Sequence, residues 1–329
     1  MLWLYILRRL GYMLMILVVV SVVGFIIIQL PPGDYLSTYI MRLEQGGMDV
    51  DEAQIAALKM RYGLDKPAPV QYAIWAWNML HGDFGRSFEW NLPVYQLVME
   101  RLPLTLVLSV ATMVFTYALA IPIGIYSATH QYSAGDFVAT VFGFIGLAIP
   151  NFLFALILMW VLYSAFGLSI GGLFSQQYLQ APWSWAKFAD LVKHLPVPLI
   201  VIGMGGTAGL IRVMRGCLLD ELRKQYVVTA RAKGVSETRL LLKYPVRIAL
   251  NPIISTIGWA LPAIVSGETI AAIVLNLPTT GPLLFRALIA QDMYLAGSTV
   301  MFLTLMTVVG ILISDILLAV MDPRIRYEK

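Results

Sequence analysis

LTLVLSVATMVFTYALAIPIGIYSA, residues 104–128, is a run of 25 residues without a charged side chain. At about 1.5 Å of rise per residue, a helix of this length crosses the roughly 30 Å of hydrocarbon in a bilayer. Lipid offers no hydrogen-bond partners, so a backbone that spans it must pair its own amide groups, as a helix does. The run therefore predicts a transmembrane helix.

Five further apolar runs lie on either side of it, at residues 10–30, 137–166, 195–213, 248–275 and 296–321. The first is longer than the core of a signal peptide, typically about 7–15 residues, and ends in Pro31-Pro32-Gly33 rather than in a small-residue cleavage site. Pro150 interrupts the 137–166 run, and an interior proline predicts a kink. We therefore expect an all-α membrane protein with six transmembrane helices.

The composition excludes an ordinary soluble protein. Hydrophobic residues make up 59% of the chain and charged residues only 13%, whereas soluble domains carry about 25% charged residues. The single cysteine, Cys217, excludes a disulfide within the chain and a cysteine-based zinc cluster. The histidines are scattered, so we expect no metal site. No Lys follows a Gly, so the GxxxxGK phosphate loop is absent and the chain is not an ATPase of that class.

Lys and Arg indicate the orientation, because membrane proteins concentrate these residues in their cytoplasmic segments. With both termini inside, the inner segments hold 14 of the 23 Lys and Arg residues and the outer segments hold 9. The densest basic stretch, residues 212–247, is then cytoplasmic, and the long loop 31–103 is extracytoplasmic. We therefore predict that both termini lie in the cytoplasm.

The outer loops contain many aromatic residues. In the first loop, residues 51–62 predict a short helix, and residues 70–80 carry aromatic side chains suited to the membrane interface. The second loop, residues 167–194, adds Tyr178, Trp183 and Trp185. Such side chains anchor loops at the membrane interface and also stack on sugars, so both interpretations stay open.

Glu268 places a carboxylate inside a predicted span. Because a buried charge is costly there, we expect Glu268 either to line a translocation path or to bond a neighbouring helix. A self-sufficient secondary transporter or channel would carry charged relays in several spans, yet Asp315 is the only other acidic residue within one. A membrane enzyme would need nucleophile groups clustered at one depth, and none is visible. We therefore favour a transport subunit that depends on partners over both alternatives.

The segment YVVTARAKGV, residues 226–235, lies in the basic stretch. Its small residues Thr229, Ala230 and Ala232 would let another surface approach closely. Gly234 suits a helix end, because glycine accepts the left-handed backbone required there. We expect a short helix, a glycine turn and a second helix that leads into the next span. Composition alone would favour a basic loop that only sets the topology.

The segment resembles the cytoplasmic loop of the dipeptide/oligopeptide permease family of ABC importers, which commonly reads Arg-Thr-Ala-Arg-Ala-Lys-Gly-Leu. Here the same positions hold Val228-Thr229-Ala230-Arg231-Ala232-Lys233-Gly234-Val235, so Val228 replaces the family's Arg. Six further matches follow the family's order: Leu7-Arg8-Arg9-Leu10, Pro32-Gly33, the outer stretch Tyr62–Pro67 with Gln71-Tyr72 and His81–Gly85, Arg101–Thr105, Ile149–Phe152 and Asp322–Tyr327. Together the seven matches cover the whole chain.

The resemblance implies a type I importer permease of the bacterial inner membrane. A first helix and an extracytoplasmic loop would occupy residues 1–101, the permease domain residues 102–320, and a cytoplasmic tail residues 321–329. The resemblance also implies that loop 212–247 contains the coupling helix, which in the family docks into a groove of the ATPase. Its site residues are Tyr226, Thr229, Ala230, Arg231, Ala232, Lys233 and Gly234.

The implied partners are a related second permease subunit that forms a heterodimer, two cytoplasmic ATP-binding subunits, an extracytoplasmic substrate-binding protein and the lipid bilayer. Neither a cofactor nor a nucleic acid is expected. The family has Glu at the position of Glu268, which would line the translocation path. Residues 275–281, LNLPTTG, keep only Pro278 and Gly281 of the family's Phe-x-x-Pro-Gly-x-Gly motif. Because this loop faces the outer vestibule, peptides, nickel and oligosaccharides, all imported within the family, remain alternative substrates.

Overall fold

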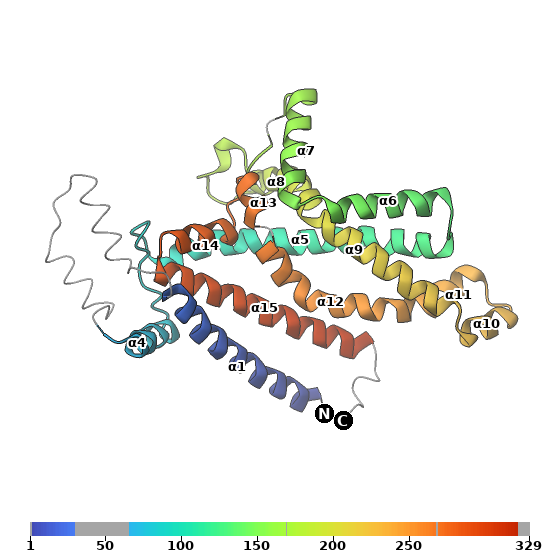
Figure 1. The fold of residues 1–329 in the computed structure, drawn as a ribbon, viewed down its shortest axis with the longest axis horizontal. Helices are drawn as coiled ribbons and strands as arrows, with labels where there is room; N and C mark the ends of the chain where they lie inside the picture. Colours follow the sequence, from blue (N-terminus) through green and yellow to red (C-terminus); the bar gives the residue numbers. More distant parts are fainter. Residues whose placement is uncertain (1, 30–65, 169, 268, 322–329) are drawn as a thin grey trace. The chain divides into compact units, whose positions relative to one another are not determined.

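The computed structural model describes residues 2–29, 66–168, 170–267 and 269–321. Across these residues the regular structure is helical, apart from one isolated bridge between Arg86 and Pro93 (Figure 1). The all-α prediction is therefore confirmed for this part of the chain. The helix predicted at 51–62 lies outside the described residues, as do the motifs at Pro32-Gly33 and Asp322–Tyr327.

The chain forms two compact units, and each is described by itself. Unit 1 comprises Met1–Pro103 and Thr279–Val308, and unit 2 comprises Leu104–Pro278 and Val309–Lys329. Unit 1 contains α1 (Leu2–Gln29), α4 (Ala68–Leu80), α14 (Thr280–Ile289) and the first parts of α5 (Val94–Thr129) and α15 (Met293–Met321). Unit 2 contains the remainder of α5 and α15 together with α6 (Ala134–Ala148), α7 (Asn151–Phe166), η1 (Gln176–Tyr178), α8 (Trp185–His194), α9 (Pro196–Leu222), α10 (Gln225–Ala232), α11 (Glu237–Lys243), α12 (Pro245–Gly267) and α13 (Thr269–Val274).

An aromatic cluster forms the core of unit 1. Trp75 of α4 is only 3% exposed and packs against Gly297 of α15, where a Cβ atom would lie 2.9 Å from the indole ring. Phe25 of α1 packs against Trp75 and Tyr72, with ring centroids 6.0 and 5.4 Å apart. We expected these α4 aromatic residues at the membrane interface. Helical spacing turns Tyr72 and Trp75 towards α1 and leaves Trp77 exposed, and the interfacial position of this helix stays a prediction.

A buried carboxylate fixes the chain just before α15. Asp292 is fully buried and accepts hydrogen bonds from the Ser87 hydroxyl at 2.6 Å and from the amides of Phe88 and Glu89 at 2.8 and 3.2 Å. Its other oxygen accepts the amide of Leu295 at 3.1 Å, which caps the first turn of α15. A buried carboxylate is costly unless its oxygens are paired, and these four donors supply that pairing.

Length and composition identify four candidate membrane spans among the described residues: Leu7–Gln29, Val94–Thr129, Pro196–Leu222 and Met293–Ile316. They match four of the predicted runs. A fifth is the pair α6 and α7, if the two count as one span, although the pair bends by 107°. The bend falls at Ile149 and Pro150, so the predicted kink at Pro150 is confirmed.

The remaining predicted span, residues 248–275, corresponds to α12 and α13, which residue 268 separates. Since Glu268 lies outside the described residues, the count of six spans stays a prediction. In unit 2, α6 and α12 both pack against α9. At Gly146 of α6, a Cβ atom would lie 3.2 Å from Met204 and 3.3 Å from Ala208, so α6 approaches α9 closely.

Candidate functional site

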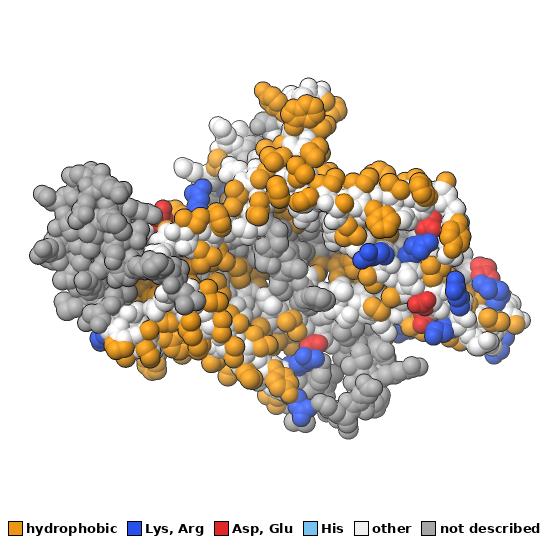
Figure 2. Space-filling model, viewed as in Figure 1, with side chains coloured by type: hydrophobic (Ala, Val, Ile, Leu, Met, Phe, Trp, Pro, Cys, Tyr) orange, Lys and Arg blue, Asp and Glu red, His pale blue; other side chains and the backbone are white. Residues whose placement is uncertain are grey.

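The basic stretch between α9 and α12 folds as two short helices, α10 and α11, drawn at the right of Figure 1. Figure 2 shows basic and acidic side chains gathered over these two helices. Each helix is anchored by one apolar residue, because Val227 of α10 and Leu240 of α11 are both 0% exposed. Burying such a side chain contributes about 1.5–3 kcal/mol. The predicted order of helix, glycine turn and helix is confirmed.

A Schellman turn ends α10. The amide of Gly234 donates to the carbonyl of Arg231 at 3.0 Å, and the amide of Val235 donates to the carbonyl of Ala230 at 3.3 Å. Gly234 has φ +75°, in the left-handed region where glycine avoids the strain that other residues meet. Together, these two hydrogen bonds fix the direction in which the chain leaves α10.

One face of α10 is open. Gln225, Val228, Thr229 and Ala232 are all exposed, and their spacing of three and four residues places them on a single helical face. Val228 is 51% exposed, an apolar side chain without cover in the isolated chain. Ala230 is half-buried on the inner side, so the small residues of the open face are Thr229 and Ala232. We expected Ala230 on that face, but the helical period separates it from Ala232.

Two polar contacts hold α10 in place. The Tyr226 hydroxyl donates to Glu221 near the end of α9 at 2.5 Å. Burial, followed by the hydrogen bond to the Glu221 carboxylate, raises the pKa of Tyr226. On the other side of the turn, Arg231 donates two hydrogen bonds to Glu237 of α11, at 2.6 and 3.0 Å. This pair is exposed, so salt screens it. Lys233 is exposed at the turn itself.

A second ion pair lies on α9, before the C-terminal end of the helix. Arg215 donates to both oxygens of Asp136 at 2.9 Å, and the side chain of Asp136 is only 5% exposed. Asp136 also accepts the amide of Tyr132 at 3.0 Å, so one carboxylate joins the start of α6, the preceding turn and α9. Next to it, α5 and α9 approach closely at Gly124, where an added Cβ atom would lie 2.6 Å from the Cβ atom of Met214. The C-terminal half of α9 is therefore clamped to α5 and α6.

Sequence reasoning did not identify Asp136 and Arg215. Arg215 was counted only among the basic residues of 212–247 and Asp136 was not considered, although opposite charges at the same predicted membrane face are a signal that could have paired them. Glu268, a candidate from the sequence, lies outside the described residues. No group of three potential metal ligands occurs among the described His, Cys, Asp and Glu residues.

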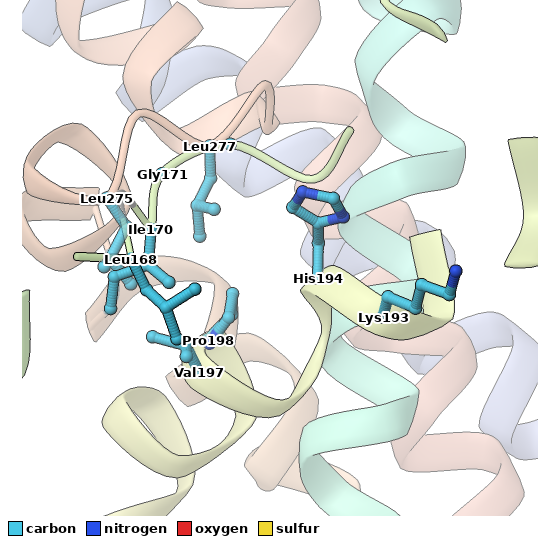
Figure 3. A pocket seen from close by; sticks show the side chains of 10 residues that line it. Leu168, Ile170, Gly171, Lys193, His194, Val197, Pro198, Leu275 and Leu277 are labelled. Atoms are coloured by element: carbon cyan, nitrogen blue, oxygen red, sulfur yellow. The ribbon is translucent and has the colours of Figure 1, made fainter. Parts of the chain in front are cut away.

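The loop at residues 275–281, which differs from the family motif, contributes to a cavity of about 270 Å³ in unit 2. Figure 3 shows aliphatic side chains such as Leu168, Val197 and Leu275 on one side and the ring of His194 on the other. The amide of Gly172 donates to the carbonyl of Leu275 at 2.7 Å, which ties the two loops that line the cavity.

The chain matches two protein-family models. The model described as "Binding-protein-dependent transport system inner membrane component" matches residues 120–327, and the one described as "Binding-prot-dependent transport system membrane comp, N-term" matches residues 1–109. The resemblance stated from the motifs is thereby confirmed.

Curated relatives agree along nearly the whole chain. The "Oligopeptide transport system permease protein AppB" of Bacillus subtilis is 36% identical, covering 98% of this chain and 99% of the relative. The "Peptidoglycan transport system permease protein YejB" of Agrobacterium fabrum is 30% identical, with 99% and 98% covered. The "Dipeptide transport system permease protein DppB" of Escherichia coli K12 is 29% identical, with 99% of each chain covered.

Proposed function

Since the chain belongs to the family of binding-protein-dependent transport system inner membrane components, we propose that it forms half of the translocation path of an ATP-driven peptide importer and that α10 receives the ATPase. The observation that carries the docking proposal is the open face of α10, Val228, Thr229 and Ala232, on a helix that the Gly234 turn holds in place.

The family establishes the class of protein. The chain is a permease, a transport component rather than an enzyme, and it works with an ATPase and a substrate-binding protein. Its apolar helices agree with a multi-pass inner-membrane protein. ATP hydrolysis is therefore the task of a partner, in agreement with the missing phosphate-binding loop.

The contacts of α10 support a mechanism of coupling. Only Arg223 and Lys224 separate α9 from α10, and the Tyr226–Glu221 hydrogen bond spans that junction. When the ATPase subunits close, a displacement of α10 thus moves the inner end of α9. The Asp136–Arg215 pair then passes the displacement to α6. ATP and substrate bind the inward-open and outward-open states with different affinities, and this difference shifts the population between them.

The finer architecture belongs to the same proposal. We infer six spans with both termini in the cytoplasm, a related permease as the heterodimer partner, and two ATPase subunits. The domain limits are 1–101, 102–320 and 321–329, and Glu268 lines the path. The positions of Lys and Arg support the orientation, and the full-length relatives support the assembly.

Peptides are the substrate class that the relatives favour, since their names refer to oligopeptides, dipeptides and peptidoglycan. The test is uptake into proteoliposomes containing this chain, its partner permease, the ATPases and the binding protein. We expect ATP-dependent uptake of a labelled tripeptide and none of a labelled trisaccharide. Trisaccharide uptake alone would refute the substrate class. Uptake by this chain without ATPase subunits would refute the importer and favour a secondary transporter.

The orientation has a separate test. In a Cys217→Ser background, a cysteine introduced as Lys233→Cys should resist a membrane-impermeant thiol reagent in intact cells and react after permeabilisation. Lys233 is exposed in the isolated chain, so protection in intact cells reports its side of the membrane rather than burial in the chain. Rapid labelling in intact cells would reverse the orientation.

A further inference from the structure

Helix α8 carries its apolar face on the outside of unit 2. Trp185 is 87% exposed, Phe188 49% and Val192 48%, and Ala189 between them is also exposed. Their spacing of three and four residues makes them one continuous face of the helix. A helix packed on a protein in water shows the opposite pattern, with apolar residues inward and polar residues outward.

The inward face of α8 holds two charged residues beside Leu191, which is 2% exposed. Lys187 is 7% exposed and Asp190 is 8% exposed. Lys187 donates to the carbonyl of Ala181 at 2.6 Å, and its amino group lies 5.0 Å from the ring of Phe174. Asp190 accepts the amide and the hydroxyl of Ser175, both at 2.7 Å. Because these charges are paired, the inward face is a stable arrangement, and the apolar outer face is the part that lacks a partner in the isolated chain.

The start and the end of α8 fix its depth. Ser184 caps the helix by accepting the amide of Lys187 at 3.2 Å. At the other end, Leu195 alone separates α8 from α9, which is a candidate membrane span. A helix joined so closely to the end of a span must lie at the level where that span meets the headgroups. Trp183, exposed just before α8, adds a second tryptophan at that level.

We propose that α8 is an interfacial helix whose outer face, Trp185, Phe188, Ala189 and Val192, inserts into the boundary between lipid headgroups and acyl chains. Tryptophan is the residue most typical of this boundary, where its ring is apolar and its N–H remains hydrated. Lys193, exposed beside this face, extends its amino group towards lipid phosphates. Among the two interpretations of the second outer loop, sugar stacking and interfacial anchoring, the geometry points to anchoring. The proposal depends on membrane insertion and not on the substrate.

The test measures what surrounds the outer face in the assembled complex. In a Cys217→Ser background, Phe188→Cys and Val192→Cys are spin-labelled one at a time, and the complex is placed in nanodiscs of phosphatidylcholine and phosphatidylglycerol. Collision of the label with oxygen, which concentrates in lipid, is compared with collision with a water-soluble nickel chelate. Gln177→Cys, an exposed polar position of the same loop, is the matched control.

We expect the labels at 188 and 192 to favour oxygen over the chelate, while the label at 177 favours the chelate. Addition of the binding protein should leave the labels at 188 and 192 unchanged. Labels at 188 and 192 that match position 177 would show a water-exposed face and overturn the proposal. Labels shielded from both collision partners would assign the face to a protein, either the second permease or the binding protein, and would also overturn it. None of these outcomes depends on peptide uptake, so the proposed function stands or fails separately.

Discussion

Gly234→Val should disconnect the permease from its ATPase through backbone strain alone. At φ +75° an L-residue with a Cβ atom costs about 1–2 kcal/mol, and valine, branched at Cβ, lies at the upper end. No atom lies within 4 Å of the position a Cβ would take, so no collision adds to this cost. A penalty of this size changes the ratio of closed to open turn by a factor of roughly 5–30. With the turn open, α10 no longer presents Val228, Thr229 and Ala232 in a fixed direction.

The assay combines peptide uptake with recovery of the ATPase in a pull-down from solubilised membranes. For Gly234→Val we expect both to fall by about 5–30-fold, while the amount of permease in the membrane stays at the wild-type level. Gly234→Asn is the matched control. Asparagine adds more side-chain atoms than valine does, but it tolerates the left-handed backbone. It should retain most of the ATPase recovery.

Two results would refute this reasoning. Equal recovery of ATPase with Asn and Val at position 234 would show that the left-handed backbone is not what the interaction requires. Normal uptake and recovery with Gly234→Val would show that segment 226–235 only sets the topology.

Two further predictions rest on the described helices, and a third, on Glu268, rests on the sequence. Ala232→Trp places a bulky side chain on the open face of α10, so it should block ATPase recovery by overpacking the interface, at a cost of roughly 1–3 kcal/mol. Ala232→Ser should not block it, and equal recovery for both variants would exclude this face from docking. Asp136→Asn leaves Arg215 without its anion. Breaking a fully buried pair costs about 3–5 kcal/mol, and the loss is smaller here because Arg215 is 28% exposed. The thermal midpoint of the purified permease should therefore fall, whereas Glu237→Gln in the exposed pair should leave the midpoint unchanged. Glu268→Gln should reduce peptide uptake with the complex still assembled; normal uptake would remove Glu268 from the path, and loss of assembly would assign it a structural role.

Much of the fold is readable from local sequence. An uncharged run such as 104–128 specifies a membrane helix without reference to the rest of the chain, because the bilayer supplies the constraint. The turn at Gly234 is local in the same way, since its hydrogen bonds join residues five or fewer positions apart. Both features therefore appear in the sequence as a pattern of apolar residues or a single glycine.

Contacts between distant residues could not be predicted in this way. Asp136 and Arg215 are 79 positions apart, and Ser87 and Asp292 are 205 apart, so each pairing depends on which helices pack together. Aromatic residues raised a different difficulty. Tyr72 and Trp75 on α4 and Trp185 on α8 give similar sequence signals, yet two of them are covered and one is open. An aromatic stripe at helical spacing fits a protein core and a lipid surface equally well.

The 107° bend between α6 and α7 constrains the order of events during biosynthesis. Residues 137–166 emerge from the ribosome as one uncharged run, and the insertion machinery responds to such hydrophobicity as to a single segment. Beyond the local kink at Pro150, the two halves pack against helices synthesised later, since α6 packs on α9 and α7 packs on α13. A nascent chain that ends before Pro196 therefore lacks the surfaces that hold the two halves apart. The packing surfaces for the two halves are therefore complete only after translation has passed α13.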